Sequence, residues 1–408
     1  MNSNADNRSG WEEVAFIDSL DQLNRPKPKK IFARDYKTGG KFPVVDQGQK
    51  FITGWTDDES LVIKTHLPLI VFGDHTRVFK FVDFPFVLGA DGTQLLKPKC
   101  DLNPHFFYYA CLNLSLPNRG YNRHFTILKE QHIPRPPLSQ QTKIAALLHK
   151  VQQAIEIEKK LIAAAREFKQ SAMQKLFAFG LNKEPQKESE IGLTPESWGI
   201  YALSDLREFL QYGTSAKCDY PKKGNPVLRI PNIIDGKIDC EDMKWCELSN
   251  KEIDSWILEE GDVVFIRTNG VRERVGTCAV YHGQPERALF ASYLIRARLD
   301  VKKLNPDFFQ YYTSTAIGTF LLGGRASPAA DGKFNINTKA IDSLLVPLPS
   351  VIEQKEIVSI LQKIDRKISV HNEKRKTLQE LFEALLKQLM TGQLSIVDLQ
   401  IDTSDITS

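Results

Sequence analysis

The sequence predicts an α+β fold: two α/β domains in tandem, each followed by a long helix, with the two helices paired as an antiparallel coiled coil. Three observations lead to this prediction. A proline-rich motif that leads into a helical pattern occurs twice. Stretches typical of β-strands precede each copy, and an apolar lane with alternating steps of four and three residues follows each copy. At 408 residues, the chain is long enough for two or three domains.

The proline-rich motif marks the end of a duplicated unit. It reads IPRPPLSQQTKIAALL at 133–148 and VPLPSVIEQKEIVSIL at 346–361, and the copies share residues at a constant offset (347 − 134 = 213 and 361 − 148 = 213). Upstream, NPHFFYYA at 103–110 matches NPDFFQYYT at 305–313, and GWEEVAFIDSL matches SWGIYALSDL near the start of each repeat. The offset grows along the chain, so the second repeat contains insertions. A repeat of this length is a duplicated domain, because solenoid repeats span only about 20–50 residues.

Each repeat is expected to begin with a mixed α/β domain. The strand-like stretches are KFPVVDQ, LPLIVF and TRVFKFV in the first repeat, and NPVLRIPNI, GDVVFIRT and ALFASYLIRARL in the second. Asn269-Gly270 predicts a tight hairpin with positive φ angles, and the polar stretch at 181–190 predicts a link between the repeats. The tail after Gly392 is expected to be weakly ordered. The predicted parts are α/β domain 1 at 1–137, a central helix at 138–180, α/β domain 2 at 181–349, a distal helix at 350–391 and a tail at 392–408.

A long helix is expected after each proline motif. Ser350 and Glu353 form a capping-box pattern at the start of the distal helix. Each apolar lane keeps its spacing for more than four heptads, which is typical of a coiled-coil seam. The alternative is that each helix packs only on its own domain. The predicted seam residues are Ile144, Leu148, Val151, Ile155, Ile162 and Leu176 in the central helix, and Ile357, Leu361, Ile364, Ile368, Leu378, Leu385 and Leu389 in the distal helix.

Polar residues interrupt both lanes near their middle. Glu158 lies in the first lane, and His371 and Arg375 lie in the second. If the helices pair, the acid and the basic groups can fix their register; a solvated kink is the alternative. With a short link between the repeats, the distal helix is expected to run back along the central one. The two α/β domains would then lie at opposite ends of a rod of roughly 50 Å, from which they could reach two half-sites on one face of DNA, whose helical turn is about 34–36 Å.

Composition and residue spacing limit the compartment, the bound metals and the membrane association that we expect for this protein. The formal net charge is +4, and neither a secretory signal nor an apolar run of the roughly 20 residues that span a membrane is visible. The six cysteines form no CxxC pair, and the eight histidines lack the spacing of metal ligands. We therefore expect a cytoplasmic protein with free thiols, no bound metal and no membrane partner.

Three short motifs resemble catalytic sequences, but each has a simpler explanation. NPDF at 305–308 lacks the second proline of the NPP[YF] motif of adenine methyltransferases, and Asn followed by Pro is favoured at the start of a helix. EQK at 353–355 lacks the clustered carboxylates of a nuclease site. GKF at 332–334 lacks the spacing of a P-loop. The sequence therefore predicts no catalytic residue and no bound cofactor.

The remaining polar chemistry suits the grooves of double-stranded DNA. Lysines mostly hold phosphates, arginine can bridge guanine, and asparagine can pair with adenine. These residue types recur at equivalent places in both repeats, before the first strands and in the loops before each proline motif, and in the second repeat arginines also surround the Asn-Gly turn. A solvated surface charge is the alternative for each of them. The predicted DNA-binding residues are Lys37, Lys41, Arg77, Arg119, Asn122, Arg123, Lys217, Lys222, Lys223, Arg229, Arg267, Thr268, Asn269, Arg272, Arg274, Arg325, Lys333 and Asn335.

The order of these parts resembles that of a known family. Two α/β domains alternate with two helices that follow motifs such as VPLPSVIEQKEIVSIL, the second domain contains IGLTPESWGIYALSDL and GDVVFIRTNGVRERVG, and LMTGQL ends the distal helix. In these respects the chain resembles the specificity subunit of type I restriction-modification systems. The first repeat departs from the pattern, because GKFPVVDQGQKFITGW and FGDHTRVFKFV replace the corresponding stretches of the second.

The resemblance implies a non-catalytic subunit. Its two target-recognition domains would each read one half of a split DNA sequence. Its helices would act as a spacer and as the docking surface for two modification (methyltransferase) subunits, to which restriction subunits can add. The alternatives are a stand-alone DNA methyltransferase or nuclease, and a repeat scaffold that binds DNA without sequence preference.

Overall fold

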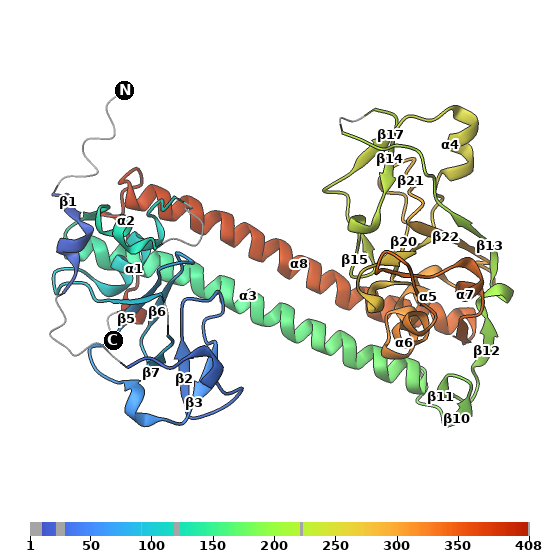
Figure 1. Ribbon diagram of the computed structural model, residues 1–408, viewed down its shortest axis with the longest axis horizontal. Helices are drawn as coiled ribbons and strands as arrows, with labels where there is room; N and C mark the ends of the chain where they lie inside the picture. The colour runs from blue at the N-terminus through green and yellow to red at the C-terminus, as the bar shows by residue number, and fades with distance from the viewer. Residues whose placement is uncertain (1–9, 22–28, 91, 118–122, 221–222, 407–408) are drawn as a thin grey trace. The chain divides into compact units, whose positions relative to one another are not determined.

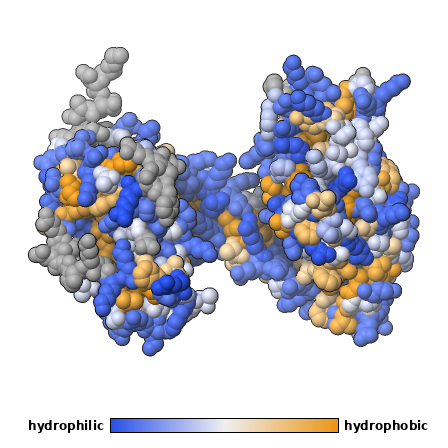
Figure 2. Space-filling model, in the orientation of Figure 1, coloured by the Kyte–Doolittle hydropathy of each residue, from blue (hydrophilic) through white to orange (hydrophobic). Residues whose placement is uncertain are grey.

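The computed structural model describes most of the chain, with gaps at 22–28, 91, 118–122 and 221–222 and at both ends, so that residues 10–406 bound the description. Within the described residues, no helix combines the length and the apolar character needed to cross a membrane. Hydrophilic side chains cover most of the visible surface (Figure 2).

The chain divides into two compact units that share two long helices. Unit 1 comprises Met1–Lys160 and Asn372–Ser408, and unit 2 comprises Leu161–His371. The helices are α3 (Leu138–Phe179) and α8 (Val351–Met390), and each contributes one part to each unit (Figure 1). The mixed strands and helices, the tandem units and the paired helices confirm the predicted fold class.

The described part of unit 1 forms small sheets of two, four and three strands and two short helices. The aromatic face of α1 packs between these sheets and the unit's parts of α3 and α8, where Phe16, Phe72 and Phe106 are buried. The sheets are β1 (Glu12–Ala15) with β9 (His132–Arg135); β3 (Gly54–Thr56), β2 (Phe42–Val45), β7 (Phe86–Leu88) and β4 (Val62–Ile63); and β6 (Phe79–Val82), β5 (Leu69–Gly73) and β8 (Thr93–Leu96). The helices are α1 (Pro104–Leu112) and α2 (Phe125–Lys129).

The described part of unit 2 has the same plan with additions. Its core gathers Trp198, Phe265 and Phe308 with residues from both long helices. The main sheets are β12 (Gly199–Ala202) with β25 (Leu345–Leu348); β13 (Arg207–Tyr212), β22 (Leu294–Leu299), β18 (Val263–Ile266) and β20 (Cys278–Val280); and β17 (Lys244–Cys246), β14 (Asn225–Leu228) and β21 (Leu289–Phe290). The smaller ones are β19 (Thr268–Asn269), β24 (Phe334–Asn335) and β23 (Ser327–Pro328); β10 (Gln186–Ser189) with β11 (Gly192–Pro195); and β15 (Ile233–Ile234) with β16 (Lys237–Ile238). The helices are α4 (Asn250–Trp256), α5 (Pro306–Thr313), α6 (Ala316–Gly324) and α7 (Thr338–Asp342).

Strand pairing confirms the duplication. Strand β1 pairs antiparallel with β9 as β12 pairs with β25, and the offsets between these strands are those of the sequence repeat. Strand β2 pairs parallel with β7 as β14 pairs with β21. Strand β5 lies between β6 and β8 as β18 lies between β20 and β22. The insertion in the second repeat contains α6, β23 and β24, which lie between α5 and α7.

A buried glutamine in each proline motif makes equivalent contacts in the two units. In unit 1, the Gln141 side chain accepts a hydrogen bond from the Asn103 backbone N–H at 2.8 Å and donates to the carbonyls of Asp101 and Pro136. In unit 2, Gln354 accepts from Asn305 N–H at 2.7 Å and donates to the carbonyls before that helix and before α8. Each glutamine therefore fastens the start of a long helix to the start of the short aromatic helix. Gln354 is fully buried, so its partners have no water to replace it.

The asparagines at these junctions also confirm the capping explanation for the two NP motifs. The Asn103 side chain accepts a hydrogen bond from Phe106 N–H at 3.1 Å, and the Asn305 side chain accepts one from Phe308 N–H at 3.0 Å. Proline follows each asparagine at the first turn of the helix, where its missing N–H costs nothing.

The long helices pack against each other within each unit. None of the thirteen predicted seam residues is exposed. In unit 1 the first half of α3 and the last half of α8 share a core, and in unit 2 the last half of α3 and the first half of α8 do so, which makes the pair antiparallel. Glu158 of α3 is buried and bonds to Lys374 of α8 at 2.7 Å, a cation that was not predicted. In unit 2, Lys169 of α3 bonds to Asp365 of α8 at 2.8 Å.

The predicted Asn-Gly hairpin is wrong. Neither Asn269 nor Gly270 has a positive φ angle, and the Asn269 side chain instead accepts a hydrogen bond from Val271 N–H at 2.9 Å. Strands β18 and β20 do pair, but residues 267–277 connect them, and this connection contains β19 and a short 3₁₀ turn. Because β24 of the insertion pairs with β19, the chain stays extended where the tight turn was predicted.

Three other expectations need correction. Ser350 caps α8 through Glu353 N–H, but the Glu353 carboxylate accepts from Leu181 N–H at 3.0 Å and so completes no capping box. The link at 181–190 is not merely a linker, because it contains β10. The tail after Gly392 packs on unit 1, where apolar residues such as Ile396 are buried.

Candidate nucleic-acid interface

The cationic residues predicted to bind DNA in unit 2 fall into two groups. In the first group, Lys217, Lys223 and Arg274 are exposed, and none of their side chains forms a hydrogen bond or ion pair with another described residue. Lys217 precedes the segment that pairs with β17, Lys223 precedes β14, and Arg274 lies in the 3₁₀ turn after β19. Lys333 is also exposed, with Asp331 at 3.0 Å. Solvated cations of this kind suit contacts with phosphates.

The arginines of the second group support the protein's own backbone. Arg229 bonds to the Asp242 carboxylate at 2.9 Å and also to its carbonyl. Arg267 donates to Ser292 O and lies over the Tyr212 ring. Arg272 donates to Gly323 O at the end of α6, and Arg325 donates to the carbonyls of α6 and of Ser343. These contacts position loops, so a direct reading of bases by these arginines stays a prediction.

Strand pairing brings several predicted residues together. In the β19–β24 ladder, Thr268 lies opposite Asn335, and Asn269 lies opposite Phe334. The Arg272 guanidinium lies over the Phe334 ring, 5.7 Å from its centroid. We call these residues, together with Arg267 and Lys333, the β19–β24 cluster. Lys217, Lys223 and Arg229 belong instead to the surroundings of β14 and β17.

In unit 1, most of the described residues that were predicted to bind DNA form hydrogen bonds or ion pairs within the protein. Lys37 bonds to Asp57 at 2.9 Å and lowers the pKa of that carboxyl, while Lys41 is exposed and its backbone N–H also bonds to Asp57. Arg77 has a φ of +63° in the β5–β6 connection and donates to Leu116 O at 2.9 Å. Arg123 is exposed, without a hydrogen bond or ion pair to the described residues. Arg119, Asn122 and Lys222 lie outside the described residues.

Two residues beside Lys217 were not among those predicted from the sequence. Tyr220 is about half exposed, and the Lys244 ammonium of β17 lies over its ring, 5.2 Å from the centroid. The Tyr220 hydroxyl also bonds to Asp242, and this bond raises the pKa of the tyrosine. An exposed aromatic ring next to lysines can stack on a base or sugar. The sequence offered only a weak signal, since the short strand KWC has no alternation to identify it.

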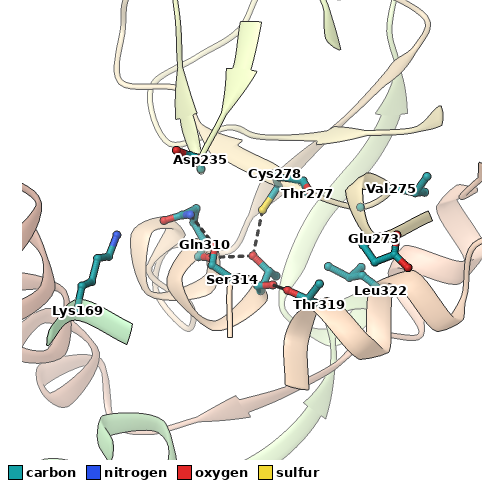
Figure 3. A pocket seen from close by; sticks show the side chains of 13 residues that line it. Lys169, Asp235, Glu273, Val275, Thr277, Cys278, Gln310, Ser314, Thr319 and Leu322 are labelled. Carbon is teal, nitrogen blue, oxygen red and sulfur yellow. Dashed lines mark hydrogen bonds between the residues drawn. The ribbon is translucent and has the colours of Figure 1, made fainter. Parts of the chain in front are cut away.

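Each unit also has a hollow where its α/β part meets the long helices. The hollow of unit 2 shown in Figure 3 has a volume of about 300 Å³ and is lined by polar residues such as Lys169, Asp235 and Gln310. A neighbouring one of about 570 Å³ shares these three residues. Cys278 contributes to the first hollow, but burial raises the pKa of its thiol to about 12, so it is protonated at neutral pH.

The hollow of unit 1 is larger and more aromatic. It has a volume of about 770 Å³ and contains His105, whose pKa is lowered to about 4 by burial and by the neighbouring His149. The repeat places different residues at equivalent positions of the two units: His105, Tyr108 and Gln152 in unit 1 correspond to Asp307, Gln310 and Asp365 in unit 2. The hollows therefore do not favour one shared ligand. Among the described residues, no group of three or more His, Cys, Asp or Glu side chains could hold a metal ion.

An apolar area in unit 2 contrasts with these polar regions. Figure 2 shows hydrophobic side chains low on this unit, where Figure 1 places α6. Phe320 of α6 is 77% exposed and Ile317 is 43% exposed. Because phosphates need cations, this face of α6 is not part of the candidate DNA interface.

Comparison with known proteins identifies relatives across most of the chain. Residues 9–167 and 195–380 each match the family described as the Type I restriction modification DNA specificity domain. The chain is 31% identical over 210 residues to the putative type I restriction enzyme MjaX specificity subunit of Methanocaldococcus jannaschii, covering 51% of this chain and 49% of that protein. It is 30% identical over 244 residues to the type I restriction enzyme EcoKI specificity subunit of Escherichia coli, covering 57% of this chain and 50% of that protein. The matched part thus spans about half the length of these relatives.

Two solved structures share the fold. The S subunit of the type I restriction-modification system of M. genitalium has a TM-score of 0.59 at 19% identity, covering 93% of this chain and 96% of that one. A chain from a structure concerned with complex assembly and conformational transition of the type I R-M system has a TM-score of 0.50 at 17% identity, covering 94% and 98%. At these identities the comparison concerns the fold alone.

Proposed function

Because the chain belongs to the type I restriction-modification DNA specificity family, we propose that it is the specificity subunit of such a system. In this proposal it reads a DNA sequence in two parts and docks the methyltransferase and restriction subunits. Catalysis belongs to those partners, and the chain's contribution is to place a methyltransferase over the target adenine of each half-site.

One observation carries the proposal: the two units share a framework but differ in the loops built on it. The β1–β9 and β12–β25 pairs, the aromatic helices and the buried glutamines are equivalent in both units. The connection between the equivalent central strands is different: residues 74–78 join β5 to β6, whereas residues 267–277 join β18 to β20. A shared framework with different loops suits two domains that bind the same kind of polymer and read different sequences in it.

The long helices support the docking part of the proposal. Phe168 of α3 is 63% exposed, and Ile352 of α8 is 72% exposed. Ile157 and Val370 are also more than half exposed. A helix that leaves large apolar side chains outside its own seam suits association with another protein. Since α3 and α8 are repeats of one another, the proposal includes two docked methyltransferase subunits.

The exposed cations of unit 2 provide a test of DNA binding. Replacing Lys217, Lys223 and Arg274 together with alanine is expected to weaken DNA binding roughly 100-fold at 0.1 M salt, and to reduce the slope of log Kd against log salt by about 2.7, since each phosphate contact contributes about 0.9. Gel-shift titrations at several salt concentrations, with the chain alone and with its candidate methyltransferase subunit, measure both quantities.

The matched control removes three charges from unit 2 at a distance from these loops. Lys355, Lys363 and Lys367 are exposed on α8. Because α8 is also part of the proposed docking surface, their triple alanine variant is titrated as the chain alone, and it should leave the salt slope nearly unchanged. Equal losses in the two variants would mean that total charge, and not the loop cations, determines binding, which would contradict the assignment of Lys217, Lys223 and Arg274.

A further inference from the structure

Two cysteines of unit 2 lie directly opposite each other on neighbouring extended segments. Asp219 and Trp245 form an antiparallel bridge and exchange two backbone hydrogen bonds, at 2.9 and 3.0 Å. On one side of this bridge the antiparallel register places Lys244 opposite Tyr220, and the Lys244 ammonium lies over the ring of Tyr220. On the other side, the same register pairs Cys218 with Cys246.

The position of this pair in the ladder is favourable for a disulfide. Since Asp219 and Trp245 exchange both of their hydrogen bonds, the adjacent pair is of the non-hydrogen-bonded type, in which the Cα atoms are about 4.5 Å apart and the side chains approach closely. Disulfides join residues whose Cα atoms are about 4.4–6.8 Å apart. Both thiols are free in this structure.

The surroundings of the two thiols differ. Cys246 is 1% exposed and belongs to a small apolar cluster with Val227 and Leu289, against which Cys218 also packs. Cys218 is half-buried, and its Sγ contacts the carbonyl oxygen of Ala216 at 3.3 Å. An oxidant in solution therefore reaches Cys218 first, and the buried Cys246 is the second thiol to react.

We propose that Cys218 and Cys246 form an oxidation site, at which hydrogen peroxide converts the two thiols into a cross-strand disulfide. In the first step, Cys218 attacks one peroxide oxygen, the O–O bond breaks, and the products are a Cys218 sulfenic acid and one water. In the second step, the Cys246 sulfur attacks the sulfenic sulfur and expels the hydroxyl group, which leaves with the Cys246 proton as a second water. Two thiols are oxidised and one peroxide is reduced to two waters.

The second step depends on the ionisation of Cys246. Burial, reinforced by the neighbouring Cys218, raises the pKa of this thiol to about 11. Since the thiolate is the attacking form, disulfide formation should accelerate as the pH rises from 7 to 9. The bond would tie the segment that carries Lys217 and Tyr220 to β17, across the candidate DNA-binding loops.

The test is chemical and uses the full chain without DNA, so its result is independent of the proposed function. The folded protein is treated with hydrogen peroxide, free thiols are alkylated, and the protein is digested without reduction for mass spectrometry. The expected product is a linked pair of peptides that contain Cys218 and Cys246, lighter by two hydrogen atoms than the separate peptides, formed faster at pH 9 than at pH 7, and absent after treatment with dithiothreitol.

Single variants separate this site from the other cysteines. Cys218→Ala and Cys246→Ala should each abolish the linked pair, and in Cys246→Ala the oxidised Cys218 should advance to sulfinic acid. Cys240→Ala, which removes an exposed thiol, should leave the linked pair unchanged. If Cys218 of the unsubstituted protein is oxidised to sulfinic acid without the linked pair while circular dichroism shows the native fold, the proposal is wrong. The same conclusion follows if neither thiol reacts under conditions that oxidise Cys240.

Discussion

Replacing Gln354 with alanine is expected to lower the free energy of unfolding of unit 2 by about 3 kcal/mol. The side chain is fully buried and satisfies three backbone groups, namely Asn305 N–H and the carbonyls of Lys303 and Pro349. Removing it leaves these groups without partners, and each buried unsatisfied group costs about 1–3 kcal/mol, less where water can enter the space. Urea denaturation followed by circular dichroism and tryptophan fluorescence measures the change.

The repeat provides an internal check on this prediction. Gln141→Ala removes the same three kinds of bonds from unit 1, so its effect should be similar and should fall on the unfolding of the other unit. Gln174→Ala, an exposed glutamine of α3, is the matched control and should change stability by less than about 0.5 kcal/mol. A Gln354→Ala variant as stable as the control would show that the glutamine does not hold the helix start.

Lengthening both long helices by one heptad is expected to increase the preferred gap between the two DNA half-sites by about three base pairs. Seven residues add about 10 Å of helix at 1.5 Å per residue, and base pairs are about 3.4 Å apart. The insertions belong after Lys160 in α3 and after His371 in α8, where the two compact units divide each helix. Both points lie at the level of the pairing between Glu158 and Lys374, so the inserted heptads would face each other.

A whole heptad is needed because it preserves the seam. The inserted heptad continues the spacing that keeps residues such as Ile155 and Ile162 in the interface if its apolar residues are the second and fifth in α3 and the fourth and seventh in α8. Selection of DNA targets with variable gaps measures the preferred spacing of each protein. A four-residue insertion in α3 alone is the control, and it should weaken binding without giving a defined new gap. If the double-heptad variant keeps the original gap, the helices do not set the distance.

Patterns with a period could be predicted from the sequence, and contacts between distant residues could not. The spacing from Ile144 and from Ile357 identified both long helices, because burial of one helix face imposes this period. The constant offset identified the two repeats. The role of Gln141 and Gln354 was not predictable, since the backbone partners that connect each of them to the aromatic helix lie about 40 to 50 residues away in the chain.

The candidate DNA residues illustrate the same limit. Arg229, Arg272 and Arg274 are equivalent by sequence criteria, because each is a cation near a strand or turn. In the structure, the Arg229 side chain bonds to Asp242 and the Arg272 side chain bonds to the end of α6, whereas Arg274 is exposed. The tight turn predicted at Asn269-Gly270 is absent, because β24 of the insertion pairs with β19 and this pairing outweighs the turn preference of the dipeptide.

The central claim is that the chain reads a split target with two different domains. Selection from a random pool of double-stranded DNA, using the full chain together with its candidate methyltransferase subunit and followed by sequencing, tests it most directly. We expect two short, unrelated motifs separated by one fixed gap of unspecified sequence. Enrichment of a single uninterrupted motif, or salt-sensitive binding that enriches no motif at all, would contradict the claim.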